Sequence, residues 1–92
     1  MKVENSTRLR ITLANGGAGI IVEGSSIDGE TTFADGAAYR TCTLTQGPGR
    51  LTLFLRKTRS GEITLAESFA RIDSDDPIIE AGWTRITDIS IV

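Results

Sequence analysis

Residues 38–69 read AYRTCTLTQGPGRLTLFLRKTRSGEITLAESF, a pattern that predicts three consecutive antiparallel strands joined by two tight turns. Segment 50–57 alternates leucine with polar or aromatic residues, so one face of the central strand is aliphatic. Glycine, proline and serine at 47–49 and 60–61 supply the backbone angles of turns on either side of it. These three strands therefore predict an all-β fold.

The composition supports the same fold class. The chain has 92 residues, which is the size of one domain, and we expect a single compact β domain over residues 1–92. Apolar residues make up 39% of the chain but aromatic residues only 5%, so we expect a core of isoleucine, leucine and valine rather than rings. Abundant threonine, isoleucine and glycine favour strands and turns over helices.

A hairpin is predicted before this unit. Residues 7–14 alternate, with Leu9 and Ile11 on one side and arginines on the other, which is typical of a half-buried strand. The pair Asn15-Gly16 is a strong hairpin-turn signal, and residues 18–23 are its return strand.

Two further segments have weaker patterns. Residues 24–36 are loop-like, with a short strand expected at 31–34. A last strand is expected at 84–92, but its alternation changes phase between Ile86 and Ile89. Either a bulge near residues 87–88 restores the phase, or the strand is covered on both faces.

Residues 65–72 fit two interpretations. A strand continues the preceding hairpin, but alternation then places Glu67 on the apolar side. A short helix accounts for the capping-box pattern at 64–67 and for the spacing of Leu65, Phe69 and Ile72. The strand is the simpler continuation, and the helix remains the alternative. The predicted fold is a mainly antiparallel β-sandwich or small barrel of about six to seven strands, with this one optional helix.

Catalytic signatures are absent from the sequence. The chain has no histidine, which removes the commonest general base and the usual activator of serine or cysteine nucleophiles. Its single cysteine, Cys42, lies in the middle of a predicted strand with apolar neighbours, so we expect a buried thiol and no intramolecular disulfide. No catalytic residue is therefore predicted.

No metal or cofactor site is predicted either. The acidic turn of Asp73, Asp75 and Asp76 lacks the glycine and the distal glutamate of a calcium loop. The glycine-rich residues 16–19 precede a strand, whereas a phosphate-binding loop opens onto a helix N-terminus. A solvated turn and a hairpin are the better interpretations.

Charge is distributed unevenly along the chain. The formal net charge is −2, but residues 36–61 contain five of the ten basic residues and none of the twelve acidic ones. If the chain folds compactly, this distribution favours two faces of opposite sign.

The basic segment is the main candidate for binding. If the leucines of segment 50–57 face the core, then Arg50, Phe54 and Arg56 project from the opposite face. Arginine beside an exposed aromatic ring can contact phosphates and bases or an acidic protein surface, although a solvated sheet face is the simpler interpretation. The candidate binding residues are Arg8, Arg10, Tyr39, Arg50, Phe54, Arg56, Lys57, Arg59 and Trp83.

Trp83 has two possible roles. Tryptophan is a favoured interface anchor, but the only tryptophan of a small domain more often packs in the core, which is the interpretation favoured here. An assembly protein would instead bury residues 20–22 or 78–83 between subunits.

On function, the sequence favours a non-enzymatic structural or assembly protein that acts by protein–protein contact, such as a virion decoration or cement subunit. The alternative is a small inhibitor protein that docks through charged faces on a larger complex, which could be one that handles nucleic acid. We expect a protein partner or a homo-oligomer; nucleic acid binding through the basic face is not favoured. No apolar run is long enough for a membrane span and no export signal is visible, so we expect a cytoplasmic or virion-associated protein.

Overall fold

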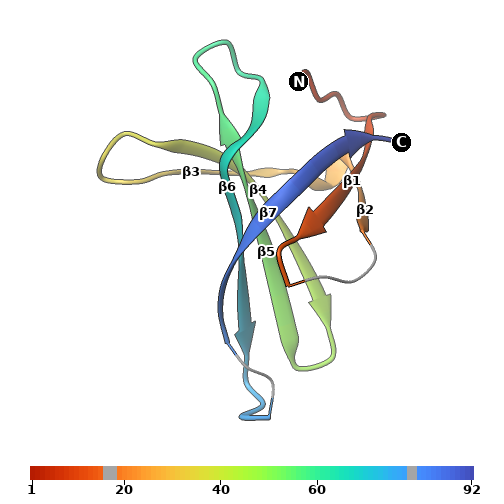
Figure 1. The fold of residues 1–92 in the computed structure, drawn as a ribbon, viewed down its shortest axis with the longest axis vertical. Coiled ribbons are helices and arrows are strands. Elements are labelled where there is room, and N and C mark those ends of the chain that lie inside the picture. Colours follow the sequence, from red (N-terminus) through yellow and green to blue (C-terminus); the bar gives the residue numbers. More distant parts are fainter. Residues whose placement is uncertain (16–18, 79–80) are drawn as a thin grey trace.

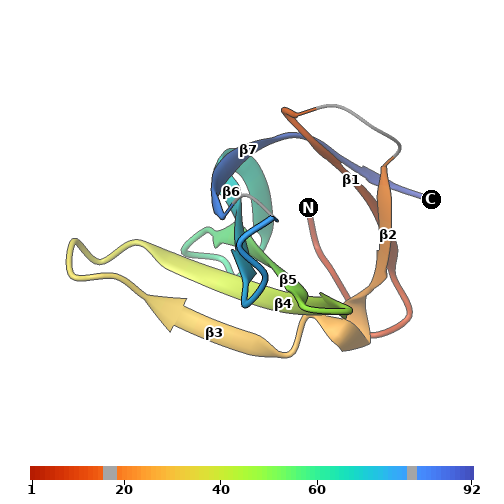
Figure 2. The same ribbon diagram turned by 90° about the horizontal axis from the view of Figure 1, so that it is seen from below.

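A computed structural model describes residues 1–15, 19–78 and 81–92 of the chain. The described residues form one antiparallel sheet of seven strands in the order β2-β1-β7-β6-β5-β4-β3 (Figure 1). The sheet curls into a half-barrel, which confirms the predicted all-β fold (Figure 2). The elements are β1 (Arg8–Leu13), β2 (Ile20–Glu23), the 3-10 turn η1 (Gly24–Ser26), β3 (Gly29–Thr32), β4 (Ala38–Gln46), β5 (Gly49–Lys57), β6 (Ile63–Ser74) and β7 (Gly82–Ile91).

The core lies on the inner, concave face of this sheet and is aliphatic, as the composition predicts. Leu9 and Ile11 of β1 belong to the same cluster as Leu53 and Leu55 of β5, and all four side chains are fully buried. The other buried members are Val22, Ile27, Cys42, Ile63, Ala70 and Ile86. The alternation of β1 and β5 therefore decides which face becomes the interior.

The predicted bulge in the last strand is confirmed. The pairing of β1 with β7 passes from Thr12–Asp88 directly to Leu13–Ile86, so Thr87 is an extra residue on β7. The bulge restores the phase and returns Ile86 to the inner face.

Residues 65–72 belong to β6, so the helical alternative is wrong. A second and larger bulge explains why simple alternation failed there. Along the β5–β6 ladder, Phe54 pairs with Phe69 and Arg56 with Thr64, which leaves residues 65–68 opposite Leu55 alone. The extra residues move Glu67 out of the apolar face to an exposed position.

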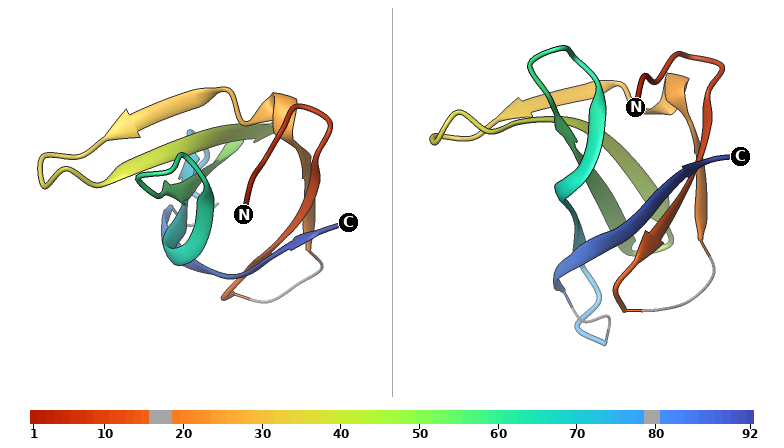
Figure 3. Two further views of the ribbon diagram at one scale, coloured as in Figure 1. Left: turned by 90° about the horizontal axis from the view of Figure 1, so that it is seen from above. Right: turned by 45° about the horizontal axis from the view of Figure 1, so that its top comes forward.

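Contacts with the N-terminal segment seal one end of the half-barrel (Figure 3). Arg40 of β4 reaches across this end and donates to the carbonyls of Val3 at 3.4 Å and Ile27 at 2.8 Å. Met1 and Ile63 exchange two backbone hydrogen bonds, at 2.8 and 3.0 Å. The segment before β1 thus lies against β6 and covers the interior at this end.

The short strand expected at 31–34 is present but begins earlier, as β3. Phe33 follows β3 in a turn, where its N–H donates to the carbonyl of Ala37. The predicted hairpin turn at Asn15-Gly16 and the glycine-rich residues after it lie largely outside the described residues, as does Ile79.

Candidate binding face

The alternation of β5 that buries Leu53 and Leu55 directs Phe54 to the outer, convex side of the sheet. Directly paired residues of an antiparallel sheet share a face, so Phe69 on β6, the partner of Phe54, also points outward. On the next row, Arg71 of β6 pairs with Trp83 of β7. The bulge at residues 65–68 sets the pairing of Phe54 with Phe69.

All the aromatic residues of the chain lie on this outer side and contact one another. Phe54 and Phe69 stack at 4.7 Å between ring centroids, and Trp83 lies 5.0 Å from Phe69. Phe33, from the β3–β4 turn, packs edge-on against Tyr39 at 5.3 Å. We call this cluster the aromatic face; it consists of Phe33, Tyr39, Phe54, Phe69 and Trp83.

The aromatic face has a buried centre and exposed ends. Tyr39 and Phe54 are covered by their neighbours, whereas Phe33 is 39% exposed and Trp83 is 65% exposed. The expectation that Trp83 packs in the core is therefore wrong. Trp83 of β7 pairs with Arg71 of β6, whose side chain lies on the outer side of the sheet. The indole of Trp83 therefore also points away from the interior.

Two arginines lie over the rings. The Arg71 guanidinium is 5.4 Å from the Phe54 ring centroid and 5.9 Å from that of Trp83. The Arg56 guanidinium is 5.5 Å from the centroid of Tyr39. Such cation–π contacts hold both guanidinium groups against the aromatic face. The face thus combines apolar rings with oriented polar edges.

Each of these arginines also pairs with a carboxylate. Arg71 Nε lies 2.9 Å from Asp73, and Arg56 Nε lies 3.2 Å from Glu67. Two other members of the basic segment pair likewise, Lys57 with Glu30 at 3.1 Å and Arg50 with Asp75 at 3.7 Å. Acidic residues from outside the basic segment therefore neutralise it at these positions, which differs from the expected separation of the charges onto two faces.

The structure brings together only part of the predicted binding set. Tyr39, Phe54, Arg56 and Trp83 meet in the aromatic face. Arg50 projects from the same side of β5 but lies at its start, beside the β4–β5 turn.

The remaining predicted residues lie elsewhere. Arg8 and Arg10 are exposed on β1, which β7 and β6 separate from β5 in the sheet. Lys57 and Arg59 line a polar cleft between the β3–β4 turn and the β5–β6 hairpin.

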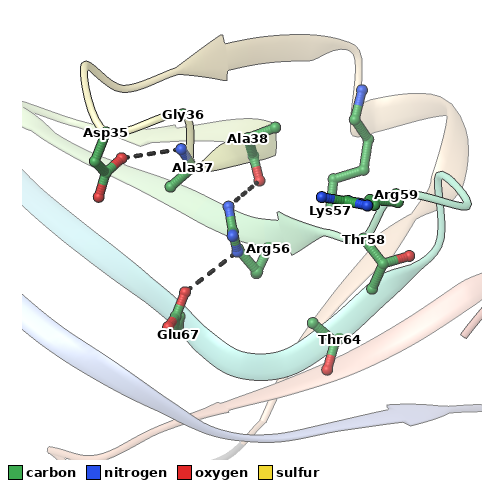
Figure 4. Close-up of a pocket in the computed structure, with 10 residues that line it drawn as sticks. All are labelled: Asp35, Gly36, Ala37, Ala38, Arg56, Lys57, Thr58, Arg59, Thr64 and Glu67. Atoms are coloured by element: carbon green, nitrogen blue, oxygen red, sulfur yellow. Dashed lines mark hydrogen bonds and ion pairs between the residues drawn. The ribbon is translucent and has the colours of Figure 1, made fainter.

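This polar cleft has a volume of about 690 Å³ and adjoins the aromatic face through Arg56 (Figure 4). Arg56 lies between the carboxylate of Glu67 and the backbone carbonyl of Ala38, to which its Nη1 donates at 3.3 Å. Both sides of the Arg56 guanidinium are thereby fixed, and Asp35 adds a second carboxylate to the cleft wall. The cleft wall therefore carries charges of both signs.

Burial controls the titration of the two weakly acidic groups in the sheet. Burial raises the pKa of Tyr39 above its ordinary value of 10.0; Arg56 opposes this effect, and Glu67 and Asp35 add to it. Burial, with a smaller contribution from Asp28, also raises the pKa of the Cys42 thiol. Cys42 is 1% exposed on the inner face, which confirms the prediction of a buried thiol.

Sequence reasoning missed three residues of the site, Phe33, Phe69 and Arg71. The hairpin register that brings Phe69 beside Phe54 follows only when the bulge at 65–68 is known. Phe33 lies in a turn outside any alternating pattern. One signal in the sequence could have pointed to these residues. The core was predicted to be aliphatic, so the few aromatic rings were to be expected outside it.

The acidic residues after β6 are engaged within the chain. Asp73 and Asp75 pair with arginines, and the Asp76 carboxylate accepts a hydrogen bond from the backbone of Ile78 at 2.9 Å. Among the residues that the structure describes, no group of three or more histidine, cysteine, aspartate or glutamate side chains is arranged to hold a metal ion. Across the same residues, none of the helical structure is long and apolar enough to span a membrane.

Comparisons with protein-family models, with curated proteins and with solved structures found no match to this chain.

Proposed function

We propose that the protein is a non-enzymatic structural or assembly subunit that acts by contact with another protein, and that the aromatic face is its contact surface. One observation supports this proposal above the others. All five aromatic residues lie outside the aliphatic core cluster, on the outer side of the sheet, and Trp83 is 65% exposed at the edge of the aromatic face.

Aromatic residues and arginine are enriched at the centres of protein interfaces, where a few of them dominate the binding energy. The aromatic face offers both residue types on a rigid sheet. Its buried centre, Tyr39 and Phe54, fixes the positions of the exposed rings. A partner would therefore bind rings that are already ordered, at little cost in side-chain entropy.

The ion pairs favour a protein partner over a nucleic acid. A phosphate backbone is bound by lysine and arginine whose charges are not already neutralised. At the aromatic face, Glu67 lies beside Arg56 and Asp73 beside Arg71. Each carboxylate would repel a phosphate approaching its arginine, whereas a protein surface can present both signs of charge.

Decoration of a virion by contact with its shell is one setting for such a subunit. The alternative is a small inhibitor that docks on a larger complex through charged groups. In favour of this alternative, Arg8, Arg10 and Arg59 have no ion pair among the described residues. These arginines are free to meet an acidic partner, but they lie on separate parts of the sheet.

Affinity capture from a native lysate, with and without nuclease, tests the proposal. The tagged protein is compared with Trp83→Ala and Phe33→Ala, and with Ile91→Ala as the matched control. Ile91 is 63% exposed, close to the 65% of Trp83, but it lies at the other end of β7, where it pairs with Leu9 of β1. We expect recovery of a stoichiometric protein partner that is unaffected by nuclease, lost with the two aromatic variants and kept by the control.

Two results would contradict the proposal. Equal recovery by the aromatic variants and the control would exclude the aromatic face as the contact surface. Recovery of a nucleoprotein complex that depends on Arg8, Arg10 or Arg59 would favour the inhibitor. Arg56→Glu is a poor probe of this alternative, since it also places two carboxylates together at Glu67.

A further inference from the structure

The two ends of the inner face are covered to different degrees. Near the end that Arg40 seals, Leu9 and Leu55 are fully buried. On the same face at the opposite end, Leu13, Leu44 and Leu51 remain only half-buried, although they pack against the core. Among the described residues, the half-barrel therefore has one closed end and one exposed apolar end.

The exposed end has an open hollow of about 500 Å³. This volume lies within the range of small-molecule sites, which are mostly apolar with a few polar groups. The hollow lies between the β1–β2 and β4–β5 hairpins, and we call it the apolar mouth. Its lining residues are Leu13, Ile20, Leu44, Gln46, Gly49, Arg50, Leu51 and Ile72.

The lining combines five aliphatic side chains with one cation. Arg50 is the charged residue of the lining; because its side chain projects from the outer side of β5, it meets the mouth at the rim. Gln46 adds an amide. The ion pair of Arg50 with Asp75 spans 3.7 Å between side chains that are 47% and 80% exposed. An exposed pair of this length contributes little free energy, so Arg50 can exchange Asp75 for another carboxylate.

We propose that the apolar mouth binds one free fatty-acid molecule, with the alkyl chain against Leu13, Leu44 and Leu51 and the carboxylate at Arg50. The chain would displace water from aliphatic side chains that the core leaves half-covered. The guanidinium would provide charge-assisted hydrogen bonds to the carboxylate. This site is separate from the aromatic face, with which it shares no residue.

A titration of the isotope-labelled protein with decanoate, below the concentration at which decanoate forms micelles, tests this inference by NMR. We expect saturable binding of one molecule, with the largest shifts at Leu13, Leu44 and Leu51. Arg50→Gln should weaken decanoate binding about tenfold, since a hydrogen bond to a charged group is lost. The same variant should leave the binding of decanol, which has no carboxylate, unchanged.

A second variant, Leu51→Trp, fills the mouth and should abolish the binding of both probes. If this variant does not fold, Arg50→Gln at the exposed rim still gives a decisive comparison. Trp83→Ala should bind decanoate like the unaltered protein, so failure of the proposed protein contact and failure of this inference give different results.

Three outcomes would overturn the inference. The first is no saturable decanoate binding, and the second is an equal loss of decanoate and decanol binding in Arg50→Gln. The third is binding to phosphatidylcholine vesicles without binding of free decanoate, which would indicate a lipid surface. A dimer that covers Leu44 and Leu51, detected by sedimentation, would exclude a fatty acid at the mouth in the same way.

Discussion

Glu67 occupies the left-handed region of backbone conformation, with φ of 67°, where a side chain is strained and glycine is not. It is the only residue other than glycine with positive φ in the described part of the chain. Its carboxylate pairs with Arg56, but the Glu67 side chain is 69% exposed, so the pair stabilises the fold only weakly. The backbone position therefore matters more for stability than the ion pair.

Substituting Glu67 tests this balance. Glu67→Gly should raise the free energy of unfolding by about 1 kcal/mol, because the relief of strain exceeds the value of the exposed pair. Glu67→Ala keeps the strain and loses the pair, so it should be slightly destabilising. Urea denaturation of the three proteins measures the difference. Equal stability of the two variants would show that the conformation at this position carries no cost.

Cys42 gives the fold a pH dependence at alkaline pH. Burial raises the pKa of its thiol above the ordinary value of 9.0, so the folded state keeps a proton that the unfolded chain releases. The stability is therefore complete below about pH 9 and falls as the pH rises through the folded pKa. Tyr39 acts in the same direction, from its higher ordinary value of 10.0.

Urea unfolding measured at intervals from about pH 7 to 11 checks this sign. The free energy of unfolding should decline above the ordinary thiol pKa, and Cys42→Ala should remove the first part of the decline while it keeps the part due to Tyr39. A profile for Cys42→Ala that matches the unaltered protein would exclude the thiol as the cause.

At the scale of a single element, the wide bulge in β6 depends on one hydroxyl. Ser68 is buried, and its Oγ accepts a hydrogen bond from the Arg56 N–H and donates one to the Thr64 carbonyl, both at 2.8 Å. The hydroxyl replaces the ladder partners that the extra residues remove. A bulge of this kind is a specified feature of the strand rather than a defect.

Ser68→Ala should lower the free energy of unfolding by about 1–3 kcal/mol, because it leaves a buried N–H and a carbonyl without partners. Ser60→Ala, in the exposed β5–β6 turn, is the control and should change stability by about 0.5 kcal/mol or less. Hydrogen exchange at the Arg56 amide should accelerate in the first variant only. An unchanged exchange rate would mean that water or another group satisfies this amide.

Element by element, the strands were predictable and the pairings were not. Alternation in segment 50–57 correctly placed Leu53 and Leu55 inside and directed Phe54 to the outer side. The expectation that Phe54 is an exposed ring is wrong, because neighbouring side chains cover it to 4% exposure. The phase slip between Ile86 and Ile89 left two alternatives, a bulge or a strand covered on both faces, and the structure has the bulge. The bulge at residues 65–68 was not predictable. It is stabilised by the Ser68 hydroxyl, which bonds to Arg56 on the neighbouring strand, and the sequence pattern does not show this pairing.

The candidate site shows the same difference between local alternation, which the sequence pattern predicts, and strand pairing, which it does not. Tyr39, Phe54 and Arg56 lie on one hairpin, so local alternation was enough to group them. Trp83 reaches them only through the β6–β7 pairing, which no local pattern encodes. Core packing was predicted for Trp83 because the only tryptophan of a small domain is more often buried. The register of β7 against β6 instead places Trp83 on the outer side, where it is 65% exposed.

At the scale of the whole molecule, the closed end of the half-barrel depends on Arg40. It lies on β4 and binds carbonyls of two segments that are distant in sequence, at Val3 and Ile27. Arginine suits this role because its planar group carries several donors in fixed directions.

Arg40→Met keeps the aliphatic part of the side chain but removes these donors. It should lower the free energy of unfolding by about 1–3 kcal/mol, because two partly buried carbonyls lose their partner. Arg8→Met, on the exposed side of β1, is the control and should change stability by about 0.5 kcal/mol or less. Thermal unfolding followed by circular dichroism measures both, and similar effects in the two variants would exclude a special role for Arg40.

Because no aromatic ring lies in the aliphatic core cluster, the intrinsic fluorescence of this protein reports on the outer side of the sheet. Trp83 is 65% exposed in the folded protein, so its fluorescence should already resemble that of an indole in water. Unfolding should therefore shift the emission wavelength little, whereas a partner that covers the aromatic face should shift it to the blue. In this domain, intrinsic fluorescence is a reporter of association rather than of folding.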